Sequence, residues 1–447
     1  MCRKTEKLKR AFSVYFVGIG GISMSALAIY LHDMGFCVCG YDKTEGQTVK
    51  ILKQKGIAVN QIGLLENCDL AVVSSAIDNE NEQIKKLRRL NKPIISRALL
   101  LSEIASTYDK VIGVAGTHGK TTATCLIAHI LKSAQMPVNA HIGGLDSVFG
   151  NVITDDLKNK NSLFLSEVCE YKQNLKFFNP TVAVILNVDD DHLESYGSFD
   201  KLKEEFKSYA ERSKLAVLNA DDQFLNSLNG IKFSVKNKNS DYFAQIINKG
   251  QNCIEYAVYE YGAPLLTVKA NSFFTHDVAN GLASVACARA LEINAESIKK
   301  GIENFKGVKR RGEVVAVING CTIFADYAHH PSQVINVINE VVTDNTAVLF
   351  QSHTYSRTKG LFKQFVYALN RCKNLYIFDT YAAREKYDYY GSGEYLSEKL
   401  PHSVYCGSAK NCISVINSFN LKYDKIVILG AGNLYDFITE NIKNIKL

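Results

Sequence analysis

Positions 116–122 read Gly-Thr-His-Gly-Lys-Thr-Thr, a run whose residue types can hold a nucleotide triphosphate. The apolar run 111–115 precedes it and predicts a buried strand that opens into a glycine-bounded loop. The glycines allow backbone N–H groups to turn onto phosphate oxygens, Lys120 supplies a charge for the β- and γ-phosphates, and Thr121 can ligate Mg²⁺. The candidate ATP-binding residues are therefore Gly116, Thr117, His118, Gly119, Lys120, Thr121 and Thr122.

A helix expected over 122–132 directs the positive end of its dipole to the same phosphates. Val114 stands where the full phosphate-loop pattern has its first glycine, so the alternative is a glycine turn with a solvated lysine. The strand, loop and helix signals agree in position, and this agreement favours the phosphate loop.

Two strand ends carry residues that suit a metal ion beside the γ-phosphate. Glu167 ends the apolar run 163–166, and His192 follows the run 182–187. The carboxyl ends of parallel strands converge on one crevice, so Lys120, Glu167 and His192 are expected to share a site. A carboxylate and an imidazole can hold a second Mg²⁺ there. The alternative for His192 is a strand-end hydrogen bond, and the rival ligands are Glu170, Asp189, Asp190 and Asp191.

A second glycine-rich turn lies near the start of the chain, between a strand expected at 13–17 and a helix expected at 22–34. Such a turn lets a pyrophosphate rest on the helix N-terminus, although a tight strand–helix turn without a ligand remains the alternative. Asp42 ends the next strand, where an acidic residue can meet a ribose hydroxyl. The pattern suits NAD, FAD or a UDP-sugar, and its candidate residues are Gly18, Ile19, Gly20, Gly21, Ser23, Asp42, Ser74, Ser75 and Ala76.

Polar residues also follow four strand-like runs in the last third of the chain, which predicts a binding edge. Arg357 and Arg384 can grip a carboxylate or a phosphate with two hydrogen bonds. Arg311, in the basic run 309–311, can reach a γ-phosphate from a hinge, although a charge run is more often a solvated face. The candidates at this edge are Asp326, His329, His353, Arg357 and Arg384.

Strand-like and helix-like segments alternate through most of the 447 residues, which predicts an α/β protein with parallel sheets. Three blocks are expected, at 1–107, 108–312 and 313–447. Hydrophobic residues make up 47% and charged residues 22%, as in soluble proteins, and no run approaches the about 18 apolar residues of a membrane span. The net charge of +7 comes from dispersed lysines and forms no basic stripe, so no nucleic-acid partner is expected. The 12 cysteines are scattered, as in a cytoplasmic protein with reduced thiols.

The order of these motifs resembles the Mur ligases of peptidoglycan synthesis over nearly the whole chain. The strings that carry the resemblance are GIGGISMSALA, GTHGKTTAT, FADYAHHP, FQSHTYSRT, DTYAARE and GAG. The resemblance implies an N-terminal Rossmann-like UDP-binding domain, a central P-loop ATPase-like domain and a C-terminal Rossmann-like domain. It also implies that Asn280 contacts adenine, that Arg311 and Asp326 reach the ATP, and that His329, His353 and Arg357 surround the incoming amino acid.

The same resemblance implies a reaction that uses ATP and Mg²⁺ to join L-alanine to UDP-N-acetylmuramate through an acyl phosphate. Lys120, His192, His353 and Arg357 are the expected catalytic residues, Thr121, Glu167 and His192 the expected metal ligands, and a monomer or weak homodimer the expected state. Three alternatives remain open: a ligase that adds a preformed murein tripeptide to the same sugar nucleotide, a dinucleotide-dependent oxidoreductase, and a non-catalytic nucleotide-binding protein.

Overall fold

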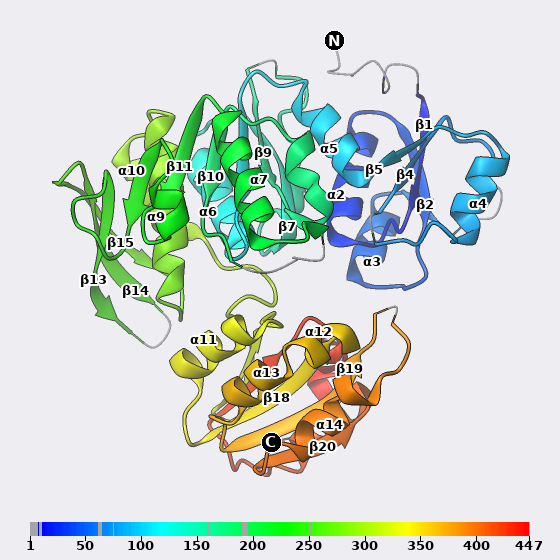
Figure 1. The fold of residues 1–447 in the computed structure, drawn as a ribbon, viewed down its shortest axis with the longest axis vertical. Coiled ribbons are helices and arrows are strands. Elements are labelled where there is room, and N and C mark those ends of the chain that lie inside the picture. The colour runs from blue at the N-terminus through cyan, green and yellow to red at the C-terminus, as the bar shows by residue number, and fades with distance from the viewer. Residues whose placement is uncertain are drawn as a thin grey trace. The chain divides into compact units, whose positions relative to one another are not determined.

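The computed structural model of the chain describes residues 8, 11–60, 65–74, 76–159, 161–189, 195–250, 253–383 and 385–446. The chain forms two compact units. Unit 1 comprises Met1–Asn271 and Thr275–Lys306, and unit 2 comprises Ser272–Phe274 and Gly307–Leu447. Within the described residues the strands form three sheets, of five, ten and six strands (Figure 1). The α/β class expected from the alternation of segments is confirmed.

The first sheet of unit 1 is parallel throughout and has the order β3-β2-β1-β4-β5. Its strands are β1 (Ser13–Val17), β2 (Cys37–Tyr41), β3 (Ala58–Val59), β4 (Leu70–Val73) and β5 (Ile94–Ser96). The helices that connect or follow them are α2 (Ile22–Asp33), α3 (Gln47–Gln54), α4 (Glu82–Arg89) and α5 (Arg97–Ala105).

Strand β1 shows why helices cover both faces of this sheet. Its side chains alternate between the faces, as in any strand. Val14 and Phe16 belong to a cluster with residues of α2, α3 and α5, whereas Tyr15 and Val17 belong to a cluster with residues of α4. A run that is apolar at every position is what a parallel strand buried on both faces requires.

The second sheet of unit 1 has the order β15-β14-β13-β12-β11-β10-β6-β9-β7-β8. It is parallel from β13 to β7; β14 and β15 continue it with antiparallel pairing beyond β13, and β8 pairs antiparallel with β7 at the other end. Its strands are β6 (Val111–Ala115), β7 (Val138–Asp146), β8 (Gly150–Ile153), β9 (Leu163–Glu167), β10 (Val182–Ile185), β11 (Leu215–Asn219), β12 (Ile231–Ser234), β13 (Tyr242–Lys249), β14 (Ile254–Glu260) and β15 (Ala263–Ala270).

Five α-helices and one 3₁₀ helix accompany the described part of this sheet. They are α6 (Lys120–Ser133), η1 (Tyr171–Phe177), α7 (Phe199–Glu211), α8 (Gln223–Asn226), α9 (His276–Ala290) and α10 (Ala295–Asn304). Helix α6 is buried along most of its length and packs against α9 and α10. This packing holds the start of α6, where the phosphate loop ends.

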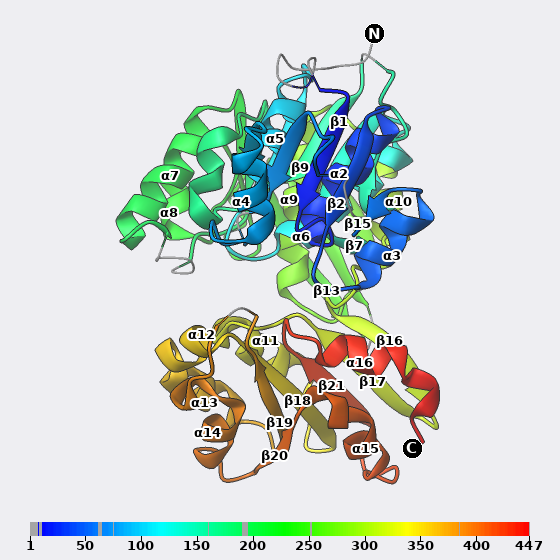
Figure 2. The same cartoon turned by 90° about the vertical axis from the view of Figure 1, so that its right-hand side faces the viewer.

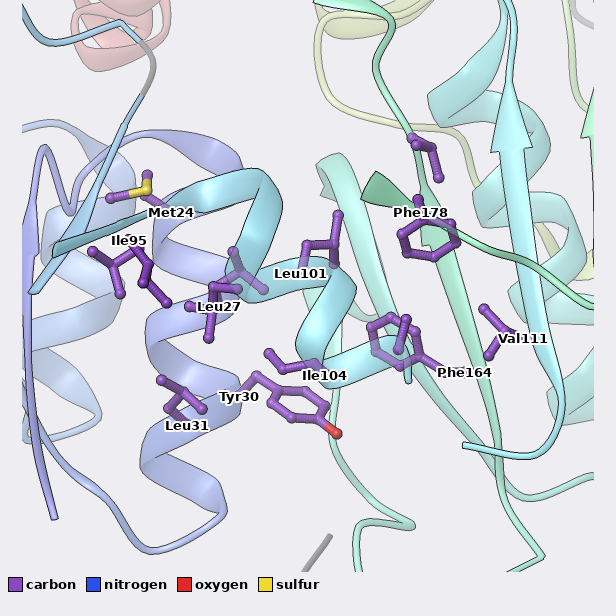
Figure 3. Packing of buried hydrophobic residues seen from close by; sticks show 14 of the residues in the cluster. Met24, Leu27, Tyr30, Leu31, Ile95, Leu101, Ile104, Val111, Phe164 and Phe178 are labelled. Carbon is purple, nitrogen blue, oxygen red and sulfur yellow. The ribbon is translucent and has the colours of Figure 1, made fainter. Parts of the chain in front are cut away.

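One apolar cluster runs from α2 and α5 into the ten-stranded sheet (Figure 3). Tyr30 of α2 meets Phe164 of β9 edge to face at 5.9 Å between ring centroids, and Tyr108 stacks on the same ring at 5.2 Å. The Tyr30 and Tyr108 hydroxyl groups lie 2.6 Å apart, so neither polar atom is buried without a partner. The two sheets of unit 1 are thereby joined by a dry, close-packed seam.

The sheet of unit 2 has the order β16-β17-β21-β18-β19-β20, and only β16 runs antiparallel to its neighbour. Its strands are β16 (Glu313–Ile318), β17 (Cys321–Asp326), β18 (Thr346–His353), β19 (Asn374–Tyr381), β20 (Ser403–Gly407) and β21 (Lys425–Leu429). Figure 2 shows α11 (Pro331–Val341), α13 (Phe362–Leu369) and α14 (Gly393–Glu398) on one face, and α15 (Cys412–Asn417) and α16 (Leu434–Glu440) on the other.

The strands expected at 13–17 and 111–115 are confirmed with the same bounds, as β1 and β6. The strand at the apolar run 163–166 extends one residue further, to Glu167. The helix expected over 122–132 begins earlier, at Lys120, because Gly119 in a left-handed conformation ends the loop. None of the described helices is long and apolar enough to cross a membrane.

The seam between the sheets generates a stability prediction. Replacing the fully buried Phe164 with alanine should lower the free energy of unfolding by about 3–5 kcal/mol, because the cavity removes contacts with Tyr30 and Tyr108. Urea unfolding followed by far-ultraviolet circular dichroism measures the change. Phe12→Ala is the matched control, since that ring is 72% exposed. A loss below about 1 kcal/mol for Phe164→Ala would contradict the role of the seam.

Candidate active site

The phosphate loop has the backbone conformation that its glycines allow. Gly116 has φ of 136° and Gly119 has φ of 83°, a region that residues with a Cβ rarely enter. The loop is held to the end of β10: the Thr117 N–H donates to the Asn187 carbonyl at 3.1 Å, and the His118 N–H donates to Asn187 Oδ1 at 2.7 Å. The loop is therefore fixed on one side by a neighbouring strand end, with Thr122 half-buried in the first turn of α6.

Lys120 lies folded against its own loop and against Glu170. Its Nζ atom donates to the carbonyls of Gly116 and Thr117 and lies 3.0 and 3.2 Å from the two carboxylate oxygens of Glu170. Glu170 is only 1% exposed. Burial acts to lower the pKa of Lys120, but the charges of Glu170 and Glu167 and the hydrogen bond to Glu170 act against it and together leave that pKa raised, so the ammonium group is charged at neutral pH.

Thr121 and Glu167, two of the expected metal ligands, are in direct contact. The Thr121 hydroxyl donates to Glu167 Oε2 at 2.7 Å. A hydroxyl and a carboxylate are hard oxygen ligands of the kind that Mg²⁺ prefers, and they lie at the end of the phosphate loop. Among the described residues no group of three His, Cys, Asp or Glu side chains forms a metal cluster.

Asn280 comes from α9, far along the chain, and lies directly on the phosphate loop. Its side chain occupies the space that a Cβ on Gly119 would need, and its Nδ2 donates to Asp277 Oδ1 at 3.0 Å. Asn280 is 5% exposed. A side chain larger than hydrogen at position 119 would therefore displace Asn280 as well as strain the loop.

The N-terminal glycine turn is built around Asp42. Its Oδ2 accepts from the Gly20 N–H at 2.8 Å, and a Cβ on Gly20 would lie 2.9 Å from the same oxygen. Gly18 has φ of 82°, Ile19 is buried, and Gly21 caps α2. Asp42 thus supports the turn itself, and its expected contact with a ribose stays a prediction.

Ser74 and Ala76 follow β4 beside this turn, and the Ala76 N–H donates to Ser74 Oγ at 3.3 Å. The side chain of Ser74 also lies near Gly18, where a Cβ would meet it at 3.5 Å. The end of β4 and the glycine turn therefore form one edge, as the sequence predicted for Ser74 and Ala76.

A polar chain links this edge to the ten-stranded sheet. Arg97 Nη1 donates to Ser23 Oγ at 3.0 Å, Ser23 Oγ lies 2.7 Å from His141 Nε2, and His141 Nδ1 lies 3.1 Å from Ser166 Oγ. Burial and the nearby Arg97 charge lower the pKa of His141 to about 3, so its ring is neutral at pH 7. Ser23 was expected at this site, whereas the sequence analysis did not identify Arg97 or His141.

Unit 2 gathers its expected residues around His353. The His353 ring lies 6.0 Å from His329 and stacks on Tyr381 at 5.6 Å. Burial and the Arg357 charge lower the pKa of His353 to about 4 and depress that of His329 further. Both imidazoles are therefore neutral at pH 7 and sit beside a permanent positive charge.

Arg311, in the segment before β16, and Asp326, the last residue of β17, lie in the same part of unit 2. The Arg311 guanidinium lies 4.8 Å above the Tyr327 ring. Asp326 accepts from the Gly312 N–H at 2.9 Å and from the Ala328 N–H at 2.8 Å. Arg310, with φ of 64°, stacks on Tyr327 and Tyr435, so the two arginines of the basic run are held by aromatic rings, whereas Lys309 is exposed.

Three expected site residues lie outside the described part of the chain: Ser75, His192 and Arg384. The rival metal ligands Asp190 and Asp191 lie outside it too, and their roles stay predictions. Glu170 was named as a rival ligand, and here it is the partner of Lys120. Glu170 lies three residues after the end of β9. The sequence could not decide which carboxylate contacts a metal and which pairs with Lys120, because Glu167 and Glu170 both lie near that strand end.

Comparisons with known proteins agree with this arrangement. The model of the Mur ligase family, catalytic domain, matches residues 13–109, and that of the Mur ligase middle domain matches residues 114–288. A UDP-N-acetylmuramate–L-alanine ligase of Agathobacter rectalis is 32% identical over 96% of this chain and 97% of its own length. The corresponding protein of Clostridium perfringens is 34% identical over 94% and 95%. The crystal structure of a UDP-N-acetylmuramate–alanine ligase from Thermotoga maritima superposes with a TM-score of 0.83 at 24% identity, over 97% of this chain and all of that one.

The buried His141 generates a prediction for the pH dependence of stability. Below about pH 6.5 the unfolded chain binds a proton at this histidine, whereas the folded chain does so only near pH 3. Stability present above pH 6.5 is therefore lost as the pH falls, by about 2 kcal/mol at pH 5. The free energy of unfolding is measured with urea at pH 7 and at pH 5. Its decrease between the two pH values should be about 2 kcal/mol smaller in His141→Gln than in the wild type.

His32→Gln is the control, because His32 lies on α2 with a side chain that is 38% exposed. Its pH dependence should follow that of the wild type. Equal losses in all three proteins would contradict the assignment of a neutral, buried His141.

Proposed function

The chain belongs to the Mur ligase family, and from that premise we propose that it joins L-alanine to the lactyl carboxylate of UDP-N-acetylmuramate. The reaction converts ATP to ADP and phosphate and forms an amide bond. It is the first addition of an amino acid to the peptidoglycan precursor. ATP and UDP-sugars are made inside the cell, so we assign the reaction to the cytoplasm.

The observation that carries this proposal is the pairing at the phosphate loop. Lys120 is charged and held at the loop, and Thr121 and Glu167 bring two oxygen ligands together beside it. Two relatives named UDP-N-acetylmuramate–L-alanine ligase cover nearly the whole chain at 32% and 34% identity. An oxidoreductase or a non-catalytic binding protein would leave this constellation unexplained.

The first step activates the carboxylate, which cannot react with an amine directly because it has no leaving group. A carboxylate oxygen bonds to the γ-phosphorus of ATP, the bond from that phosphorus to the β,γ-bridging oxygen breaks, and ADP departs. Lys120 lies where it can offset the charge on the transferred phosphoryl group. Thr121 and Glu167, with His192, would hold Mg²⁺, which adds further positive charge at that point.

The second step forms the amide. The amine of L-alanine attacks the acyl carbon, phosphate leaves from the tetrahedral intermediate, and one proton is lost from nitrogen. His353 is neutral at pH 7 and therefore has a lone pair to accept that proton, and His192 is the other candidate. Arg357 is suited to stabilise the oxyanion, and His329 and Arg384 to position the amino acid.

We assign the parts of the reaction to three domains. Residues 1–107 would hold the UDP-sugar through Gly18–Gly21, Ser23, Asp42 and Ser74–Ala76. Residues 108–312 would hold ATP, with Asn280 at the adenine and Arg311 at the phosphates. Residues 313–447 would supply the amino acid site, with Asp326 reaching the ATP. The protein is expected to act as a monomer or a weak homodimer.

A ligase that adds a preformed murein tripeptide to the same sugar nucleotide was the alternative from the sequence. The relatives named above act on L-alanine by their names, and at 32% and 34% identity they favour the single amino acid. We expect the choice among L-alanine, glycine and L-serine to depend on the side chains that surround His353 in unit 2.

Phosphate release from ATP and Mg²⁺ tests the proposal directly. With UDP-N-acetylmuramate present, L-alanine should stimulate release, and L-Ala-γ-D-Glu-diaminopimelate should not. Lys120→Met should lower this rate by about hundredfold or more, because the charge at the transferred phosphoryl group is lost. Stimulation by the tripeptide alone would show the recycling ligase instead, and no stimulation by either would refute a ligase acting on this sugar nucleotide.

Two controls separate catalysis from folding. Lys132→Met removes a lysine from the other end of α6, where it pairs with the exposed Asp155, and should leave the rate unchanged. Lys120→Met leaves the buried Glu170 carboxylate without its partner, so the double variant Lys120→Met/Glu170→Gln should recover thermal stability and remain inactive.

A further inference from the structure

Arg97 is the first residue of α5, at the carboxyl end of β5, and it lies between the two sheets of unit 1. Its side chain lines a small pocket with residues of α5 and of the segment that follows β9, namely Ala98, Leu101, Val168, Cys169, Asn174 and Phe178. Burial lowers the pKa of this guanidinium group. Arginine nevertheless stays protonated in proteins, so a full positive charge stands in this crevice.

This charge has no counter-ion of its own. Arg97 donates from Nη1 to Ser23 Oγ, and no carboxylate of the described residues lies within ion-pairing distance of it. Glu167 is near enough to influence its pKa, but the carboxylate of Glu167 accepts from Thr121 instead. Glu170, on the same segment, is paired with Lys120.

Arg97 is half-buried. A guanidinium that is partly withdrawn from water with no carboxylate beside it is costly to keep, so it is retained where a ligand supplies the missing anion. Arg97 has five N–H donors in a planar fork, and one of its terminal nitrogens is engaged by Ser23. The remaining donors suit a planar two-oxygen acceptor, which is the geometry of a carboxylate.

We propose that Arg97 binds the lactyl carboxylate of the sugar nucleotide and holds it beside the phosphate loop. This inference rests on the proposed function and adds a substrate-binding residue to it. The carboxylate must reach the γ-phosphate beside Glu167 and Thr121. Arg97 donates to Ser23, which follows the glycine turn, and lies near enough to Glu167 for the two charges to interact.

The pyrophosphate of the same ligand is the competing anion. Its expected place is the glycine turn, where backbone N–H groups of the α2 N-terminus are available. The pocket of Arg97 is lined instead by Ala98 and Leu101 of α5 and by Val168, Cys169, Asn174 and Phe178, which follow the end of β9 at Glu167. The position of the pocket therefore favours the reacting end of the substrate.

The charge of Arg97 has a physical purpose in this reaction. A carboxylate approaching ATP is repelled by the triphosphate, and a cation on the far side of the carboxylate offsets that repulsion. Bidentate binding also fixes which oxygen faces the phosphorus. Ser23 and His141 hold the guanidinium in place through the polar chain described above.

Calorimetric titration with two sugar nucleotides tests this proposal. UDP-N-acetylmuramate carries the lactyl carboxylate, and UDP-N-acetylglucosamine has the same UDP and sugar without it. Arg97→Met should weaken binding of the first about tenfold to hundredfold and change binding of the second by less than about threefold. Arg97→Lys, which keeps the charge but loses the fork, should fall between Arg97→Met and the wild type.

Arg89→Met, an exposed arginine on α4, is the control and should bind both ligands as the wild type does. The ratio of two affinities measured on one preparation does not depend on the fraction of folded protein. Equal weakening of both ligands would overturn the proposal in favour of the pyrophosphate, and no weakening of either would overturn it outright.

The wild-type protein separates failure of this proposal from failure of the proposed function. If phosphate release depends on L-alanine but Arg97→Met keeps its preference for UDP-N-acetylmuramate, only the assignment of Arg97 is wrong. If the wild type itself binds the two sugar nucleotides equally and shows no release, both are wrong.

Discussion

The apolar seam between α2, α5 and the ten-stranded sheet is the constraint on which the arrangement of unit 1 depends. Tyr30, Tyr108 and Phe164 fill it with rings in direct contact. Close packing of this kind fixes α2 and β9 relative to each other, because a buried ring cannot shift without opening a cavity. The helix that carries Tyr30 begins at the glycine turn, and the strand that carries Phe164 ends at Glu167. The seam therefore fixes the glycine turn at the start of α2 relative to the phosphate loop, and the proposed reaction between two bound substrates requires such a fixed arrangement.

The polar groups along this edge are paired before any substrate arrives, with one exception. Lys120 has Glu170, Thr121 has Glu167, and the phosphate loop has Asn187. Such pairs keep the site organised at little reorganisation cost, and each has an acidic or amide oxygen that a ligand or metal could replace or share. Arg97 is the group whose charge the protein leaves for a ligand to balance.

The strand ends and the phosphate loop were predictable because local signals specify them. The apolar run 111–115 predicts a strand, and the glycines at 116 and 119 predict the turn that follows it, all within nine residues. Strands β1, β11 and β21 are likewise short, mostly apolar runs. Asn280 was implied only by family resemblance, since nothing local connects α9 with Gly119. Arg97 and His141 were not predicted as site residues because their importance comes from their position between two sheets. The pattern of apolar and polar residues along the sequence does not reveal such a contact. Helix α6 was expected two residues late for a local reason, the left-handed Gly119 that lets Lys120 start the helix.

In each of the two units, an arginine lies close to partly or fully buried histidines and lowers their pKa. His141 in unit 1 lies beside Arg97, and His329 and His353 in unit 2 lie beside Arg357. In each case burial and the neighbouring guanidinium keep the imidazole neutral at pH 7, so the positive charge beside each histidine comes from a group that does not titrate near pH 7. Both ring nitrogens of His141 face serine hydroxyl groups, so this neutral ring holds its neighbours by hydrogen bonds. Each of the two groups of residues therefore keeps the same charge across physiological pH.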